Sequence, residues 1–101
     1  MRSLNVRILP FEDREKHAKI LRERGLNIDD VDLAFFMAAV IVSKPESRVF
    51  KATGMFEGHR CTVIGEWYGR EAIRLRTMYP ASNKDKQRYE RYRKANPEMD
   101  R

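Results

Sequence analysis

The sequence has 101 residues, a net charge of +6 and one cysteine. This length favours a single domain, residues 1–101, with a modest core. A lone Cys61 excludes an internal disulfide and favours a reducing compartment. The longest apolar run, residues 33–42, is too short for a transmembrane helix, and the N-terminus lacks the basic and apolar regions of a signal peptide.

The first part of the chain predicts one short strand and two helices. Residues 5–9 alternate and predict a strand that ends at Pro10. Asp13 can cap a helix from Arg14 to Arg24, and Gly25 can end it because glycine tolerates positive φ. The expected apolar stripe of this helix comprises His17, Ala18, Ile20 and Leu21.

A second helix is expected to begin near Asp29 or Asp30. Apolar residues follow there at a spacing of three to four, which predicts contact with a core. These residues are Val31, Ala34, Phe35 and Ala38. A loop should follow at residues 43–47.

The second part predicts three strands, at residues 49–56, 60–68 and 72–78, separated by short loops. Strands at this spacing indicate an antiparallel meander. The fold class is therefore α+β, with helices expected over one sheet face and a small antiparallel sheet of three meander strands plus the N-terminal strand.

A third helix should close the chain. Ser82 and Asp85 form a capping-box pattern, so the helix should begin at Asn83 and run to about Lys94. Its apolar anchors are few, mainly Tyr89 and Tyr92. Such a polar helix is expected to hold weakly to its own core and to project or dock on a partner.

Positive charge is concentrated at the end of the sequence. Residues 74–101 carry nine Lys or Arg against four Asp or Glu, whereas residues 1–73 carry 12 against 11. Such a region attracts polyanions. A solubilising helix face is the alternative interpretation. The residues that we expect to contact RNA are Arg60, Trp67, Arg76, Lys84, Lys86 and Arg88.

Strand alternation predicts how the last strand presents its side chains. Arg74, Arg76 and Met78 should share the open sheet face. The opposite, covered face should carry Ile73, Leu75, Thr77 and Tyr79. Arginines on a sheet face near Trp67, Tyr68 and Tyr79 would offer phosphate contacts and base stacking.

No metal site or cofactor is expected, because two histidines and one cysteine do not show ligand spacing. Cys61 is expected in strand packing, and His59 in a turn. The remaining chemistry is that of Arg, Lys and Tyr near a strand end. Such groups can promote RNA cleavage by the substrate's own 2′-hydroxyl, through orientation and neutralisation of charge on the phosphorane.

Several motifs resemble those of the BrnT family, RelE-like ribonuclease toxins of type II BrnT/BrnA toxin–antitoxin pairs. The family's N-terminal pattern is Asp-x-x-Lys, then Asn, then Lys-His-Gly. Its counterparts here are Asp13, Lys16 and Glu23-Arg24-Gly25, with Ile20 in place of the Asn and Arg24 in place of the His. Arg48 and Gly54 match its central Arg and Gly, shifted by one position.

The C-terminal pattern, Ile-Arg-Ile-Ile-Ser-x-Arg-x-Ala with Glu-Arg and Tyr after it, is the most specific. Its counterparts here are Arg74, Thr77, Ala81, Asp85-Lys86 and Tyr89. Tyr79 stands where the family has its second Arg, and alternation predicts that Arg76 points away from Tyr79. Tyr can stack or donate a proton but carries no charged fork for phosphate.

The resemblance implies a BrnT-like domain at about residues 4–94 with a flexible tail at 95–101. It also implies a cytoplasmic toxin that cleaves messenger RNA without a metal ion, with no membrane association. Its partner would be a BrnA-like DNA-binding antitoxin, in a heterotetramer that represses its own promoter. The implied site consists of Lys16, Arg48, Arg74 and Tyr79. Both arginines would bind phosphate, and Lys16 would help to neutralise its charge. Tyr79 would donate a proton or stack on a base.

Two other hypotheses stay open. The Tyr79 difference favours a catalytically inactive module that binds an antitoxin and supports repression of DNA. A general RNA-binding protein outside any toxin system is the third. Growth arrest on expression of the chain alone would distinguish the first hypothesis from the second.

Overall fold

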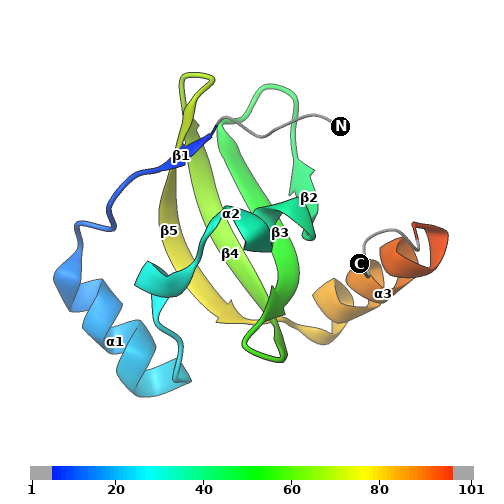
Figure 1. Cartoon of the computed structure of the whole chain (residues 1–101), viewed down its shortest axis with the longest axis horizontal. Helices are drawn as coiled ribbons and strands as arrows, with labels where there is room; N and C mark the ends of the chain where they lie inside the picture. The colour runs from blue at the N-terminus through cyan, green and yellow to red at the C-terminus, as the bar shows by residue number, and fades with distance from the viewer. Residues whose placement is uncertain (1–5, 97–101) are drawn as a thin grey trace.

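A computed structural model describes residues 6–96 of the chain (Figure 1). Asn5, with which the first predicted strand begins, and most of the predicted tail at 95–101 lie outside the described residues. The elements, in order, are β1 (Arg7–Ile8), α1 (Arg14–Arg24), η1 (Ile28–Asp30), α2 (Leu33–Met37), β2 (Val40–Ser43), β3 (Val49–Phe56), β4 (His59–Tyr68), β5 (Ala72–Pro80) and α3 (Asn83–Ala95). None of the helices within residues 6–96 has the length and apolar content needed to cross a membrane.

The strands form one sheet in the order β1-β5-β4-β3-β2. The β3–β4–β5 meander is antiparallel, as predicted, whereas β1 pairs in parallel with the start of β5. This confirms the α+β class. The sheet has one strand more than expected, since β2 pairs with β3 along its outer edge.

The β2 strand was missed because it ends a continuous apolar run. Residues 33–42 contain no polar break, so periodicity alone cannot separate a short helix from the strand that follows. In the structure Met37 ends α2, and Val40 begins β2. Val40 is buried, whereas Ile41 and Val42 are 50% and 43% exposed at the sheet edge.

Helices cover both faces of the sheet, which corrects the expectation of one covered face. On the core face, α2 packs so closely that a Cβ on Gly54 would lie 3.3 Å from the Phe35 ring. On the opposite face, α3 approaches β3 and β4 through Asp85, which bonds to Lys51 and Thr62. We call this second face the α3 face. Figure 1 shows α2 in front of the sheet and α1 beside the β5 edge.

A β-bulge in β5 changes which residues share a face. Ile64 pairs with Thr77 and Gly65 with Leu75, which leaves Arg76 without a residue opposite it on β4. An extra residue inverts the alternation beyond it. Met78 therefore lies in the core, fully buried, and Thr77 and Tyr79 join Arg74 on the α3 face. The predicted assignment of Thr77, Met78 and Tyr79 to faces was wrong for this reason.

The predicted limits of α1 are confirmed. Asp13 accepts the backbone N–H of Lys16 at 3.0 Å, and Gly25 ends the helix at φ 69°. The expected apolar stripe is only partly correct: Ile20 is buried and His17 half-buried, but Ala18 and Leu21 face solvent. Only a narrow row of α1 residues is buried, because the helix packs on the sheet along the β5 edge.

The predicted second helix is two elements. Asn27 caps the short η1, and Asp32 then caps α2 by accepting the Phe35 N–H at 3.2 Å. A second cap three residues into the expected helix interrupts it. Val31 and Phe35 are buried as expected, whereas Ala34 is exposed.

The start of α3 is held to the sheet by a buried polar network. Asp85 is 1% exposed and accepts hydrogen bonds from Thr62, at 3.1 Å, and from Lys51 and Arg88, at 3.4 and 3.2 Å. Thr62 in turn lies 3.0 Å from the Thr53 hydroxyl. Burial by itself raises the pKa of Asp85, but the bonds from Thr62 and Lys51 outweigh it and hold the pKa below its usual value.

Candidate active site

The hollow whose side chains best fit an active site lies where α1 begins, beside the middle of β5. The β1 strand pairs only with Ala72 and Ile73, so the β5 edge beyond them is free for α1 to approach. The space has a volume of about 260 Å³. We call it the Arg74 hollow; it is lined by Phe11, Glu12, Asp13, Lys16, Glu66, Arg74, Leu75 and Arg76.

Arg74 is held in place by aromatic and acidic neighbours. Its guanidinium carbon lies 4.7 Å from the Tyr68 ring centroid, and Nη1 donates to the Tyr68 hydroxyl at 3.5 Å. Its Nη2 is 4.0 Å from the Glu12 carboxylate. Among residues 6–96, no group accepts a hydrogen bond from the buried Nε. Arg74 is thus oriented by its neighbours, and its Nη2, which is too far from Glu12 for a hydrogen bond, can donate to an anion.

Glu66 lies directly across the sheet from Arg74, because the β4–β5 register pairs the two residues. Both line the Arg74 hollow. A carboxylate beside two cations can accept a proton from a hydroxyl group, while the cations stabilise negative charge. Sequence reasoning missed Glu66, since its place opposite Arg74 depends on the register of the β4–β5 pair.

Lys16 and Arg74 line the same hollow, as predicted. The Asp13 cap fixes the first turn of α1 and thereby the position of Lys16 over β5. Arg76 also lines the Arg74 hollow, which agrees with the expectation that it lies on the same side of the strand as Arg74. Tyr79, from which Arg76 was expected to point away, does not line this hollow.

Arg48 and Tyr79 are not brought to the Arg74 hollow. Tyr79 shares the α3 face with Arg74 but lies about 17 Å further along the strand, at roughly 3.4 Å per residue. Arg48 is exposed in the bend before β3, where its carbonyl accepts the Trp67 N–H at 2.9 Å. Neither residue lines the hollow.

A second hollow, of about 330 Å³, continues from the first along α1. We call it the Thr77 hollow; its lining includes Asp13, Lys16, Lys19, Arg24 and Thr77. Arg24 donates to the Thr77 hydroxyl at 3.3 Å and to the Met78 carbonyl at 2.7 Å. These bonds fasten the end of α1 to β5. Arg24 was not predicted as a site residue.

The residues expected to contact RNA lie in different places. Arg60 is paired with Glu90 at 2.6 Å, and Arg88 with Asp85 at 3.2 Å. Lys84 is exposed and Lys86 half-buried on α3. Trp67 packs on the core face, 6.0 Å from the Phe50 ring, so the expectation of an open stacking ring beside Arg74 was wrong.

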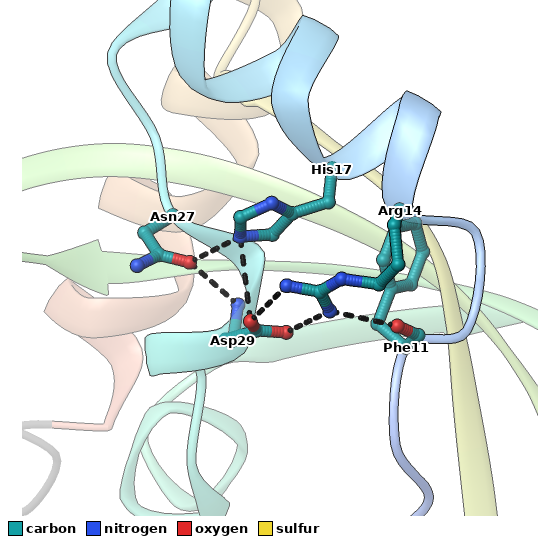
Figure 2. Close-up of polar contacts among 5 residues, drawn as sticks. All are labelled: Phe11, Arg14, His17, Asn27 and Asp29. Atoms are coloured by element: carbon teal, nitrogen blue, oxygen red, sulfur yellow. Dashed lines mark hydrogen bonds and ion pairs between the residues drawn. The ribbon is translucent and has the colours of Figure 1, made fainter.

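The two histidines do not enter the Arg74 hollow. Figure 2 shows His17 between α1 and η1, where Nε2 donates to Asn27 at 2.9 Å and lies 3.3 Å from Asp29. Arg14 holds the same Asp29 carboxylate through two bonds of 2.9 and 3.2 Å. These bonds from Arg14 lower the pKa of Asp29. The cluster joins α1 to η1. His59 was expected in a turn, but it is the exposed first residue of β4, directly after the β3–β4 turn.

Comparisons with known proteins bear on the fold. No protein-family model matches the sequence, and no curated protein matches it. A search of solved structures matches the crystal structure of the Brucella abortus ribonuclease toxin BrnT, with a TM-score of 0.61. The match is 24% identical and covers 80% of this chain and 100% of that one. The expected resemblance is thereby confirmed for the architecture: this chain has the fold of the BrnT ribonuclease toxin.

Proposed function

We propose that this protein is the toxin of a type II toxin–antitoxin pair and acts as an endoribonuclease on messenger RNA in the cytoplasm, without a metal ion. The observation that carries the proposal is the convergence of Lys16, Arg74 and Glu66 on one hollow. Its support from comparison is the fold shared with a protein described as a ribonuclease toxin.

The proposed reaction uses the 2′-hydroxyl of the substrate as nucleophile. Glu66 takes the proton of that hydroxyl, whose oxygen attacks the adjacent phosphorus. Arg74 and Lys16 bind the phosphate and stabilise the phosphorane, and Arg76 supplies a further charge at the same hollow. The bond between phosphorus and the 5′-oxygen breaks, and this oxygen takes up a proton from solvent, which yields a 2′,3′-cyclic phosphate and a new 5′-hydroxyl. The roles of Arg48 and Tyr79 stay predictions, tested by Arg48→Ala and Tyr79→Phe.

Cleavage of single-stranded RNA in EDTA by the purified chain tests this function. We expect 2′,3′-cyclic phosphate ends, and a loss of about 100-fold or more in rate for Arg74→Ala and for Glu66→Gln. Arg22→Ala, an exposed cation on α1, is the matched control and should cleave normally. Equal rates for Arg74→Ala and Arg22→Ala would remove Arg74 from the mechanism.

The proposal includes a cognate DNA-binding antitoxin of BrnA type, in a heterotetramer. Support from the surface comes from Met37 of α2 and Ile41 of the edge strand β2, which are 63% and 50% exposed and line one apolar hollow between α2 and the sheet. Exposed apolar edge strands favour pairing with another chain. Co-expression with the product of the neighbouring reading frame, followed by measurement of the mass of the complex, tests the partner and its stoichiometry.

The second candidate function is an inactive binding module that keeps the fold and the antitoxin. Tyr79 in the position of the second family Arg favours it, and so does the engagement of Arg74 by Tyr68 and Glu12. Expression of the chain alone separates the two candidates. Growth arrest that Arg74→Ala abolishes supports the toxin, whereas unimpaired growth together with antitoxin binding supports the module.

A further inference from the structure

The Arg74 hollow is one end of a longer cationic path. It shares Asp13 and Lys16 with the Thr77 hollow. Arg24 lines both the Thr77 hollow and a third hollow of about 530 Å³ beside the β3–β4 turn, which also contains Arg60 and Lys86. These two residues in turn line a fourth hollow, of about 530 Å³, along α3.

We infer that these four hollows form one binding track for single-stranded RNA, which continues from the Arg74 hollow around the end of the sheet and along α3. The inference rests on the proposed function for the location of the cleaved phosphate. The four hollows are lined by more cations than carboxylates. The cations are Lys16, Lys19, Arg24, Arg60, Arg74, Arg76, Lys86, Arg91 and Lys94, and the carboxylates are Glu12, Asp13, Glu15, Glu57, Glu66 and Glu90.

The α3 end of the track is the most strongly cationic part. Its carboxylate, Glu90, is neutralised by Arg60 at 2.6 Å. Among residues 6–96, no carboxylate lies within ion-pairing distance of Lys86, Arg91 or Lys94. Three cations that form no ion pair among residues 6–96 line one groove, and their charge is available to an anionic ligand.

The chemistry of the α3 hollow favours a nucleic acid over an acidic peptide. Every residue that lines it is polar or charged: Arg60, Asn83, Lys86, Gln87, Glu90, Arg91 and Lys94. A peptide in a groove relies on apolar anchors in pockets, whereas a phosphodiester backbone needs cations and hydrogen-bond donors. Continuity with the Arg74 hollow points to the strand that is cleaved there.

The track is long enough for several nucleotides. From Arg74 to Pro80, β5 spans about 20 Å, and from Asn83 to Lys94, α3 spans about 17 Å. The path of about 37 Å would hold about ten stacked nucleotides at roughly 3.4 Å each. Short substrates therefore lose the contacts that lie beyond the Arg74 hollow.

Binding of fluorescent 2′-O-methyl RNA, which lacks the nucleophile and is not cleaved, tests the track separately from catalysis. We expect an oligonucleotide of about 12 residues to bind at least about tenfold more tightly than one of about four. The double variant Arg91→Glu/Lys94→Glu should bind the longer RNA about tenfold or more weakly and lower the magnitude of its salt slope by about 1.4, at roughly 0.7 per lost phosphate contact.

The matched control is Arg22→Glu/Lys44→Glu, which makes the same change of charge at exposed positions outside the track. It should keep the affinity and salt slope of the wild type, and Arg91→Lys/Lys94→Arg should keep both as well. Equal weakening by the two charge-reversed variants would overturn the track in favour of unspecific attraction. If an acidic peptide of equal charge displaced the fluorescent RNA as effectively as unlabelled RNA does, the groove would be assigned to a protein ligand instead.

The outcomes separate the track from the proposed function. Length-dependent binding that needs Arg91 and Lys94, without cleavage of ordinary RNA, supports the track and removes the ribonuclease. Cleavage of short and long RNA with equal efficiency supports the ribonuclease and overturns the track.

Discussion

Removal of the Asp85 carboxylate should release α3 from the sheet. The bond from the buried Thr62 hydroxyl to a charged acceptor contributes about 1.5–3 kcal/mol. Lys51 and Arg88 are 38% and 35% exposed, so solvent screening limits each of their pairs to about 0.3–0.5 kcal/mol. We therefore expect Asp85→Ala to lower the free energy of unfolding by about 2–4 kcal/mol. For a domain of this size the melting temperature falls by about 10–25 °C.

Urea denaturation followed by circular dichroism measures this loss. Gln87→Ala, an exposed position on the same helix, is the control and should change stability by less than about 0.5 kcal/mol. If Asp85→Ala and Gln87→Ala unfolded at the same urea concentration, the buried network would not hold α3, and the reasoning from burial and hydrogen bonding would be refuted.

The pH dependence tests the charge itself. Because the pKa of Asp85 lies below its unfolded value of about 3.9, folding favours the ionised form. The stabilisation is present above that value and is lost as the pH falls through the folded pKa. The difference in unfolding free energy between the wild type and Asp85→Asn should thus stay constant above about pH 5 and shrink below about pH 4. A difference that grew on acidification would contradict the assigned direction.

Three further changes have defined outcomes. Gly65→Ala should destabilise the chain by about 1–3 kcal/mol in urea, because its Cβ would lie 2.6 Å from the Phe50 ring; Gly69→Ala, where no neighbouring atom lies within 4 Å, isolates the cost of positive φ. Burial raises the pKa of the Cys61 thiol, so the folded chain should react with a thiol reagent far more slowly than the chain in urea, and equal rates would contradict its burial. Asp13→Ala should cost about 1 kcal/mol and also slow RNA cleavage, since the cap positions Lys16; a stability loss without slower cleavage would separate Lys16 from the reaction.

Local patterns in the sequence determined most of the secondary structure. The Asp13 and Ser82 caps and Gly25 set the ends of α1 and the start of α3, because each supplies or accepts a bond within a few residues. Alternation and turn residues located β3, β4 and β5 for the same reason. The resemblance to BrnT motifs predicted that Lys16 and Arg74 belong to one site, and both line the Arg74 hollow.

Tertiary structure alone decided how these elements meet. The bulge at Arg76 moved Met78 into the core and turned Thr77 and Tyr79 to the α3 face, and no local pattern reveals a bulge, because it exists only relative to the partner strand. The pairing of Glu66 with Arg74 is likewise a matter of register between strands. The Asp85 network explains why so polar a helix stays on the sheet. The carboxylate of Asp85, the last residue of the capping-box pattern that Ser82 begins, also accepts a hydrogen bond from the buried Thr62 hydroxyl on β4.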